Sequence, residues 1–280
     1  MDHFLIVDGS NLLFQMFYGM PARITGKNGR PIHGTLGFLG ALLKIIRFVK
    51  PTHVCVCFDG ECHNERTDLD ENYKANRPDF SQMPEEDTPF SQLPDIYGAL
   101  DLLGICHRET DCCEADDWIA AFCRTYGGEN RVTVVSQDSD FFQLITETVR
   151  ILRYRGENSV LCDIDYIRQK LGIEPSQYAD FKSLTGDAAD NIKGAEKVGP
   201  KTAAALLHQF GSLENALKNT CQIKKPSVRA SLEASGDRLR QNQKLIRLEG
   251  DCLLPFTRQQ MAYTYGGQSS RQILSQLDIL

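Results

Sequence analysis

The sequence predicts an α/β fold in which a parallel-sheet domain, residues 1–172, is followed by an all-helical region, residues 173–280. Three observations favour this organisation. Short apolar runs rich in β-branched residues alternate with helical patterns, as in β-α-β units. Two of these runs end in Asp-Gly, at Asp8 and Asp59. After Asp163 the pattern becomes helical to residue 280.

The composition is that of an ordinary globular protein, with 41% hydrophobic and 24% charged residues in a chain of 280. No apolar run approaches the roughly 20 residues of a membrane-spanning helix, and the N-terminus lacks the pattern of a signal peptide. Ten cysteines without a Cys-x-x-Cys pair predict reduced packing residues in a cytoplasmic protein rather than a zinc site. The net charge of −6 argues against indiscriminate nucleic-acid binding, although it averages acidic and basic stretches.

The first two strands are predicted at residues 4–7 and 53–58, where the chain is apolar and rich in β-formers. The first should deliver Asp8 at its C-terminal tip, and a helix should begin near residue 11. A longer apolar helix is expected over 38–49, before the second strand, which ends at Asp59. In parallel sheets ligands bind at the carboxyl ends of strands, so we expect the two aspartates at one edge.

Residues 61–88 interrupt this alternation with a polar, charged stretch. Such a long insertion in a compact domain is uncommon and is typically a functional or mobile loop. A helical pattern resumes at 90–103, and residues 105–108 lead toward the next helix. A third clear strand, 131–136, precedes Asp138 and Asp140, and residues 149–153 and 159–162 are expected to pair as a hairpin.

Three carboxylates fall within four residues at the start of the helix that follows residue 113, namely Glu114, Asp116 and Asp117. Glu114 and Asp117 should share a helix face, with Asp116 beside them. Acidic residues are favoured in the first turn of any helix, which is the simpler explanation. Three crowded carboxylates nevertheless repel one another unless a cation lies among them.

The helical region contains two motifs. Residues 185–191 form an acidic turn with Asp187 and Asp190. Residues 194–203 have the pattern of a helix–hairpin–helix, in which glycines permit a tight turn whose N–H groups can hold a phosphate. A basic stretch that we expect to contact a nucleic-acid backbone, or to be a solvated face, has only Glu233 and Asp237 as opposing charges; its members are Lys218, Lys224, Lys225, Arg229, Arg238, Arg240, Lys244 and Arg247.

The candidate metal ligands form one set when strand tips, helix start and acidic turn are combined. The set is Asp8, Asp59, Glu114, Asp116, Asp117, Asp138, Asp140, Asp187 and Asp190. Each of these acids, taken alone, could instead have a purely structural role as the cap of a helix or turn. Together, carboxylates without His or Cys suit Mg²⁺ or Mn²⁺. So many acids predict a pair of ions, which in proteins serves phosphoryl displacement.

The motifs in this order resemble the 5′-nuclease (flap endonuclease) family, in particular the 5′–3′ exonuclease domain of bacterial DNA polymerase I and its stand-alone relatives. The matching segments are Val7-Asp8-Gly9, Phe58-Asp59, Tyr73-Lys74-Ala75-Asn76-Arg77, Glu114-Ala115-Asp116-Asp117, Asp138-Ser139-Asp140, Thr185-Gly186-Asp187-Ala188-Ala189-Asp190-Asn191 and residues 194–203. They cover nearly the whole chain.

The resemblance implies a PIN-like catalytic domain with a helical arch over 61–108, and a helix–hairpin–helix (H3TH) region in 173–280. Lys74 and Arg77, at the base of the arch, would stabilise charge on the scissile phosphate, and Arg66 could join them. Tyr73 would stack on a base or pack. The resemblance further implies that the hairpin grips duplex backbone, with a K⁺ ion on its carbonyls; the residues expected there are Gly194, Lys197, Gly199, Lys201 and Thr202.

The function so implied is Mg²⁺-dependent hydrolysis of phosphodiester bonds near 5′ ends and single-strand/duplex junctions, by two metal ions. Expected substrates are DNA with a 5′ flap, an overhang or an RNA primer. Because no polymerase sequence follows, we expect a free-standing monomeric nuclease. Two alternatives remain open: a non-catalytic junction-binding protein that kept the fold, and a Mg²⁺ phosphatase acting on small phosphate esters.

Overall fold

The computed structural model describes residues 1–27, 29–60, 65–76, 80, 82–111 and 113–280. Its centre is a six-stranded sheet in the order β3-β2-β1-β4-β5-β6, in which the first five strands are parallel and β6 is antiparallel to β5. The strands are β1 (His3–Asp8), β2 (His53–Phe58), β3 (Cys106–Glu109), β4 (Arg131–Val135), β5 (Val149–Arg153) and β6 (Val160–Cys162).

The order of the strands reverses beside β1. The chain runs from β1 outward to β2 and β3, and then returns to pair β4 with the opposite side of β1. At such a point the two connections leave the sheet in opposite directions, which opens a crevice outside the carboxyl ends of the strands. Asp8 ends β1 and Asp59 directly follows β2, so the expected convergence of these strand tips is met.

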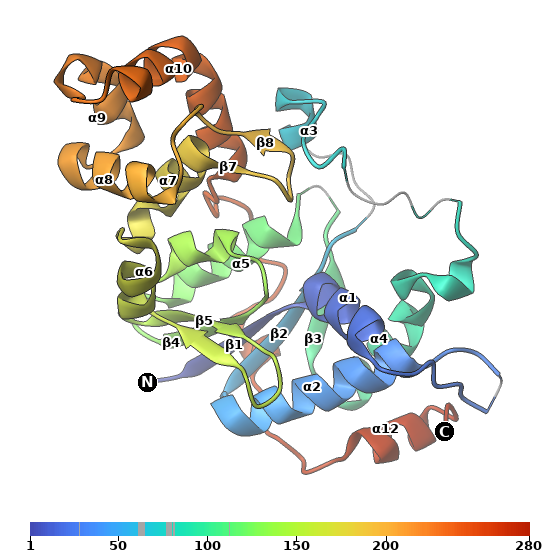
Figure 1. Ribbon diagram of the computed structural model, residues 1–280. Coiled ribbons are helices and arrows are strands. Elements are labelled where there is room, and N and C mark those ends of the chain that lie inside the picture. Colours follow the sequence, from blue (N-terminus) through green and yellow to red (C-terminus); the bar gives the residue numbers. More distant parts are fainter. Residues whose placement is uncertain (28, 61–64, 77–79, 81, 112) are drawn as a thin grey trace.

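Helices cover both faces of the sheet (Figure 1). One face packs on α1 (Gly9–Gly19), α2 (His33–Val49) and α4 (Leu93–Leu102). The other packs on α5 (Ala115–Tyr126) and α6 (Ile164–Leu171). Because both faces are covered, the central strands are apolar on both sides, which is why they read as continuous hydrophobic runs.

The helical region shares its core with the sheet domain. A single cluster of buried side chains extends from Phe141 of the 3-10 helix η3 (Asp140–Leu144) to Leu232 of α10 (Pro226–Ile246). The remaining elements here are η4 (Pro175–Gln177), α7 (Tyr178–Thr185), the hairpin β7 (Gly186–Asp187) and β8 (Ile192–Lys193), α8 (Pro200–Phe210), α9 (Leu213–Lys218) and η5 (Thr220–Gln222). The helical prediction after residue 163 therefore missed one short hairpin.

The C-terminal residues return to the sheet domain instead of staying with the helical region. Helix α11 (Arg258–Met261) contacts β2, and α12 (Ser270–Gln276) packs on α2 and α4. Ile273 and Leu274 of α12 are fully buried against the apolar side of α2. Short helical patterns do not reveal which surface they bury, so the sequence did not predict that α11 and α12 would pack on the sheet domain.

The polar insertion contains little helix in its described part. It includes the five-residue α3 (Glu65–Leu69), followed by the 3-10 helices η1 (Glu85–Asp87) and η2 (Pro89–Gln92). Helix α4 and strand β3 belong to the sheet domain, since Ile96 and Leu100 are buried in its core. The predicted arch boundary at residue 108 was therefore too late, and β3 itself was not anticipated.

Other expectations concern pairing and chemistry. The hairpin of 149–153 with 159–162 is confirmed as β5 and β6. The cysteines in the described part of the chain are free thiols. Over the same part, no helix combines the length and the apolar character that crossing a membrane requires.

Candidate metal centre

Asp8 lies at the centre of the crevice, at the junction of β1 and α1. It caps α1, since its Oδ1 accepts the backbone N–H of Asn11 at 3.0 Å. The hydroxyl of Ser136 donates to its Oδ2 at 2.7 Å. Burial, and then the charge of Asp59, raise the pKa of Asp8 to about 7. Its capping role is thus real, and the carboxylates of Asp59 and Asp138 are also close enough to raise its pKa.

Asp59 connects the tip of β2 with the start of α5. Its Oδ1 accepts the backbone N–H of Ala115, the first residue of α5, at 2.9 Å. Its own backbone N–H donates to the hydroxyl of Ser10 at 2.8 Å. The free N–H groups at a helix start favour a carboxylate. This bond holds the acidic helix start beside the carboxyl ends of the strands.

Asp116 joins this group from the first turn of α5. Burial raises its pKa well above the usual range, and the charges of Asp138 and Asp8 raise it further. Burial likewise raises the pKa of Asp138, whose carboxylate accepts the backbone N–H of Asp140 at 2.8 Å. Mutual elevation of pKa values indicates carboxylates that lack sufficient positive charge around them.

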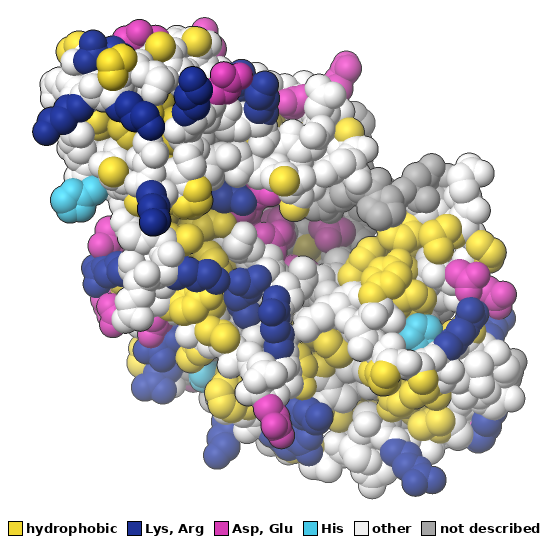
Figure 2. All heavy atoms as spheres, in the orientation of Figure 1, with side chains coloured by type: hydrophobic (Ala, Val, Ile, Leu, Met, Phe, Trp, Pro, Cys, Tyr) yellow, Lys and Arg dark blue, Asp and Glu magenta, His cyan; other side chains and the backbone are white. Residues whose placement is uncertain are grey.

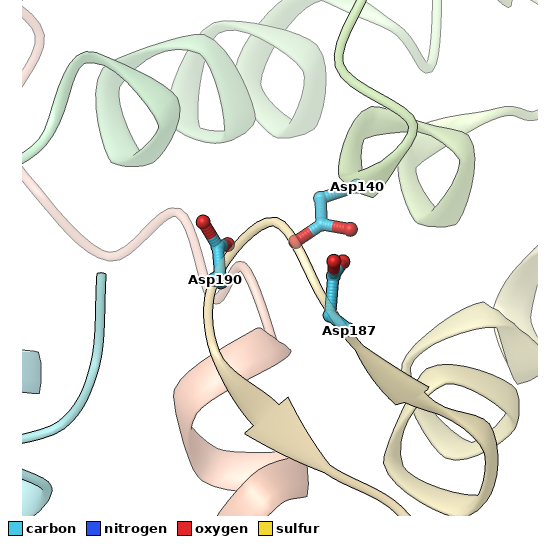
Figure 3. A group of neighbouring side chains, drawn as sticks. All are labelled: Asp140, Asp187 and Asp190. Carbon is cyan, nitrogen blue, oxygen red and sulfur yellow. The ribbon is translucent and has the colours of Figure 1, made fainter. Parts of the chain in front are cut away.

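A second acidic group lies where the helical region meets the sheet. Asp140, Asp187 and Asp190 each offer a carboxylate oxygen, and these oxygens lie within 4.8 Å of one another. Figure 3 shows the three side chains pointing toward a common point, from η3 and from the β7–β8 hairpin. Asp138 links the two groups electrostatically, because the charges of Asp190 and Asp187 also raise its pKa.

These residues fit divalent cations. Oδ1 of Asp140 is buried and has no hydrogen-bond partner among the described residues, and the charge of Asp138 adds to burial in raising its pKa well above the usual range. A buried carboxylate oxygen left in this state is costly unless a cation binds it. The donor set is oxygen alone, as hard cations such as Mg²⁺ and Mn²⁺ prefer.

Glu114 and Asp117 share a helix face, as expected, but that face meets basic side chains. Arg66 is 9% exposed and forms ion pairs with both carboxylates, at 2.6 Å between Nη2 and Oδ1 of Asp117. Lys74 forms an ion pair with Glu114. Asp117 also accepts the backbone N–H of Glu114 at 3.3 Å. Neighbouring helix positions point about 100° apart, so Asp117 pairs with Arg66 while Asp116 lies near Asp138 and Asp8. Metal binding by Asp117 stays a prediction.

Lys182 is a charged residue that the sequence reasoning missed. It forms an ion pair with Asp187, and both side chains are largely buried. Its charge lowers the pKa of Asp140 against the effect of burial. The available signal was its position as the one basic residue of α7, the helix that leads into the acidic turn.

The predicted hairpin of residues 194–202 is a compact turn before α8. Gly194 is required there, since a Cβ would overlap the backbone of Thr185 and Gly186. Gly199 caps α8 and is exposed, as are Lys197 and Lys201, while Thr202 is half-buried. The exposed turn therefore presents two ammonium groups to the solvent beside the positive end of a helix, an arrangement suited to a phosphate.

Several side chains of the wider basic surface are already bound to other groups of the protein. Glu214 is an additional opposing charge, which pairs with Lys218 at 3.3 Å and with Arg240 at 3.0 Å. Arg238 donates to the carbonyl of Gly194 at 3.1 Å. The expectation that only two acids oppose this surface was wrong, because Glu214 lies on a different helix from its partner Arg240.

Tyr73 and Arg77 complete the predicted residues. Tyr73 is 7% exposed and packs in an apolar cluster with Ile192 and Leu245. Of the two roles expected for Tyr73, packing is therefore the one seen in this conformation, and contact with a base stays a prediction. Arg77 lies outside the described residues.

Figure 2 shows a hollow between the helical region and the sheet domain, with acidic side chains on its floor and basic ones along one side.

Sequence comparison finds two family profiles that together span most of the chain. The 5′–3′ exonuclease N-terminal resolvase-like domain matches residues 3–172, and the 5′–3′ exonuclease C-terminal SAM fold matches 173–268. The chain belongs to the 5′–3′ exonuclease family.

Individual relatives agree with this family. A 5′–3′ exonuclease of Aquifex aeolicus is 34% identical over 247 residues, which are 88% of this chain and 81% of the relative. DNA polymerase I of Rhizobium leguminosarum is 36% identical over 259 residues, but the chain spans only 25% of its length. The bacteriophage T5 D15 flap endonuclease, solved with DNA and metal ions, shares the fold with a TM-score of 0.71 at 21% identity, over 88% of this chain and 89% of that one.

Proposed function

We propose that this 5′–3′ exonuclease family member hydrolyses phosphodiester bonds of DNA near 5′ ends and single-strand/duplex junctions, with Mg²⁺ as its cofactor. The observation that carries the proposal is the convergence of buried acids with raised pKa values at one crevice of the sheet. A DNA- and metal-bound flap endonuclease with the same fold supports it. Flaps, overhangs and RNA primers are the proposed substrates.

The proposed ligands divide between two ions. Asp8, Asp59, Asp116 and Asp138 would hold one, with Glu114 beside them, and Asp140, Asp187 and Asp190 would hold the other. When bound, divalent ions of such a pair activate the attacking water and stabilise charge on the leaving oxygen. Mn²⁺ would substitute for Mg²⁺, because both prefer oxygen ligands.

The chain's own cations have a separate proposed role. Lys74 lies at the edge of the acidic group, close enough for its charge to lower the pKa of Asp116 against the effect of burial. An ammonium group at this position would stabilise negative charge that develops on the scissile phosphate. Arg77 and Arg66 are proposed to assist, Arg66 chiefly by holding the start of α5 in place.

Duplex binding is proposed for the turn before α8. Gly194, Lys197, Gly199, Lys201 and Thr202 would grip the phosphate backbone, and a K⁺ ion on backbone carbonyls would strengthen that contact. We further propose a monomer acting in the cytoplasm. All proposed ligands come from one chain, and free thiols suit a reducing compartment.

The test is cleavage of a 5′-labelled flap duplex with Mg²⁺ by the parent protein and by Asp138→Asn, with Asp101→Asn as the control. Asp101 is an exposed acid on α4 and lies outside the acidic groups. We expect Asp138→Asn to lose at least about a thousandfold in rate and Asp101→Asn to match the parent. Equal cleavage by both variants would refute the metal assignment, while binding of flaps without cleavage under any divalent metal would favour the non-catalytic alternative.

A further inference from the structure

The backbone of the segment that carries Lys74 is bound to the helical region, while the basic side chains of Lys74 and Arg66 pair with the start of α5. Three side-chain amides donate to backbone carbonyls across this boundary. Asn76 donates to Ala188 at 2.9 Å, Asn191 to Asn72 at 3.0 Å, and Gln241 to Leu69 at 2.6 Å. We call these residues, with the backbone that they bind, the arch-base contact.

An apolar anchor stands at the centre of the arch-base contact. The ring of Tyr73 is buried among side chains from α7, β8 and the end of α10, namely Ala179, Ile192, Leu245 and Ile246. Burial of an aromatic side chain contributes more than any one of the hydrogen bonds around it. Tyr73 directly precedes Lys74, so this anchor fixes where the next backbone unit lies.

The backbone of Lys74 is bound to the acidic turn itself. Its N–H donates to the carbonyl of Asp190 at 3.1 Å. Lys74 and Asn191 both adopt left-handed backbone conformations, with φ of 57° and 59°. Such conformations are uncommon for residues other than glycine and persist where surrounding contacts hold them. Here the two lie on opposite sides of the same contact.

We infer that the arch-base contact makes Asn76, Asn191 and Gln241 positioning residues for Lys74. The helical region then carries Asp187, Asp190 and the backbone of Lys74 together, while the ammonium group of Lys74 reaches Glu114 at the start of α5. Any displacement of the helical region relative to the sheet moves Asp187, Asp190 and the backbone of Lys74 together, relative to Asp140 of η3. This inference rests on the proposed catalytic role of Lys74.

The test uses Asn76→Ala and Asn191→Gly, each alone and both together. They are made in the parent protein and in the Lys74→Ala variant. Glycine at 191 keeps the left-handed backbone free of strain while removing the amide donor. The control is Asn219→Ala, whose amide donates only to Asn215 within the helical region. Single-turnover cleavage of a flap duplex, affinity for the duplex, and trypsin cleavage after Lys74 are measured for each.

We call Asn76→Ala and Asn191→Gly the docking substitutions. We expect each of them to slow single-turnover cleavage by about tenfold, which is the upper range for the loss of one hydrogen bond. Affinity for the duplex should change by less than about threefold, and Asn219→Ala should change neither. In the Lys74→Ala background the docking substitutions should not slow cleavage any further, because their effect passes through the ammonium group that this variant lacks. Cleavage by trypsin after Lys74 should accelerate in the docking variants that keep this lysine.

Two failures are distinguishable. If Lys74→Ala slows cleavage but the docking substitutions slow it by the same factor again, their effect does not pass through Lys74 and the inference is overturned while the proposed function stands. Unchanged trypsin cleavage after Lys74 would overturn it as well. If Lys74→Ala cleaves as fast as the parent, the proposed role of Lys74 falls, and its positioning with it.

Discussion

The ammonium group of Lys74 is paired with the carboxylate of Glu114, and both side chains are largely buried at the edge of the acidic crevice. Arg66 compensates Asp117 in the same way. The charge left over lies on the acids whose pKa values burial raises; these are Asp8, Asp116, Asp138 and Asp140. Lysine and arginine side chains of the chain thus neutralise the carboxylates at the edge of the crevice. The carboxylates at its centre are left to be neutralised by bound metal ions.

Stability without divalent metal should fall as pH rises. The pKa of Asp8 is raised from 3.8 to about 7 by burial and then by Asp59. A carboxyl with a higher pKa when folded stabilises the protein fully below pH 3.8 and loses that contribution as pH rises through about 7. In calorimetry with EDTA, Tm should be lower at pH 8 than at pH 5.5.

Two controls separate this effect from general pH dependence. Saturating Mg²⁺ should reduce the difference in Tm between the two pH values, because bound cations compensate the ionised acids. Asp8→Asn should reduce it too, since one of the titrating groups is gone. A Tm that rises with pH in EDTA would contradict the predicted direction.

Lys182→Met should increase affinity for divalent metal. The substitution keeps an unbranched side chain of nearly the same length but removes the cation that pairs with Asp187. At an effective dielectric constant of about 20, losing one neighbouring cation is worth about tenfold or more in binding constant. Titration calorimetry with Mn²⁺ measures it, and Lys170→Met, at an exposed lysine bonded to Tyr166, is the control. Weaker Mn²⁺ binding by Lys182→Met would show that Lys182 does not compete with the metal.

Gly194→Ala should destabilise the helical region, whereas Gly199→Ala should not. A Cβ at 194 would meet the backbone of Thr185 and Gly186, while a Cβ at 199 would meet nothing within 4 Å. Overpacking against a backbone that cannot move costs typically about 1–3 kcal/mol. Urea unfolding of the two variants measures the difference. Equal stability would mean that the turn adjusts more easily than its packing indicates.

Lys197→Ala and Lys201→Ala should weaken duplex binding without changing the cleavage step. Both lysines are exposed beside the start of α8, so each is expected to neutralise one phosphate. Each substitution should lower the slope of log affinity against log salt by about one. Fluorescence anisotropy over a series of KCl concentrations measures the slope, with Lys50→Ala, at the end of α2, as the control. An unchanged slope would remove these lysines from the proposed interface.

Several parts of the fold follow from local patterns. The apolar strands and their aspartate tips could be read directly because parallel strands buried on both faces leave continuous hydrophobic runs. Strand β3 could not, since Cys106–Glu109 is short and half-exposed at the edge of the sheet. The return of α12 to the sheet domain was likewise hidden, because an amphipathic helix shows that it buries a face without showing against what.

The sequence by itself determined the acids, their order along the chain and the strand tips that carry Asp8 and Asp59, because residue type and the period of hydrophobicity are local properties. Only the tertiary structure decided which carboxylates face the crevice and which face Arg66, and where Tyr73 is buried. Those outcomes depend on helix direction and on packing between segments far apart in the chain. One example is the bond between Lys74 and Asp190, which no local pattern encodes.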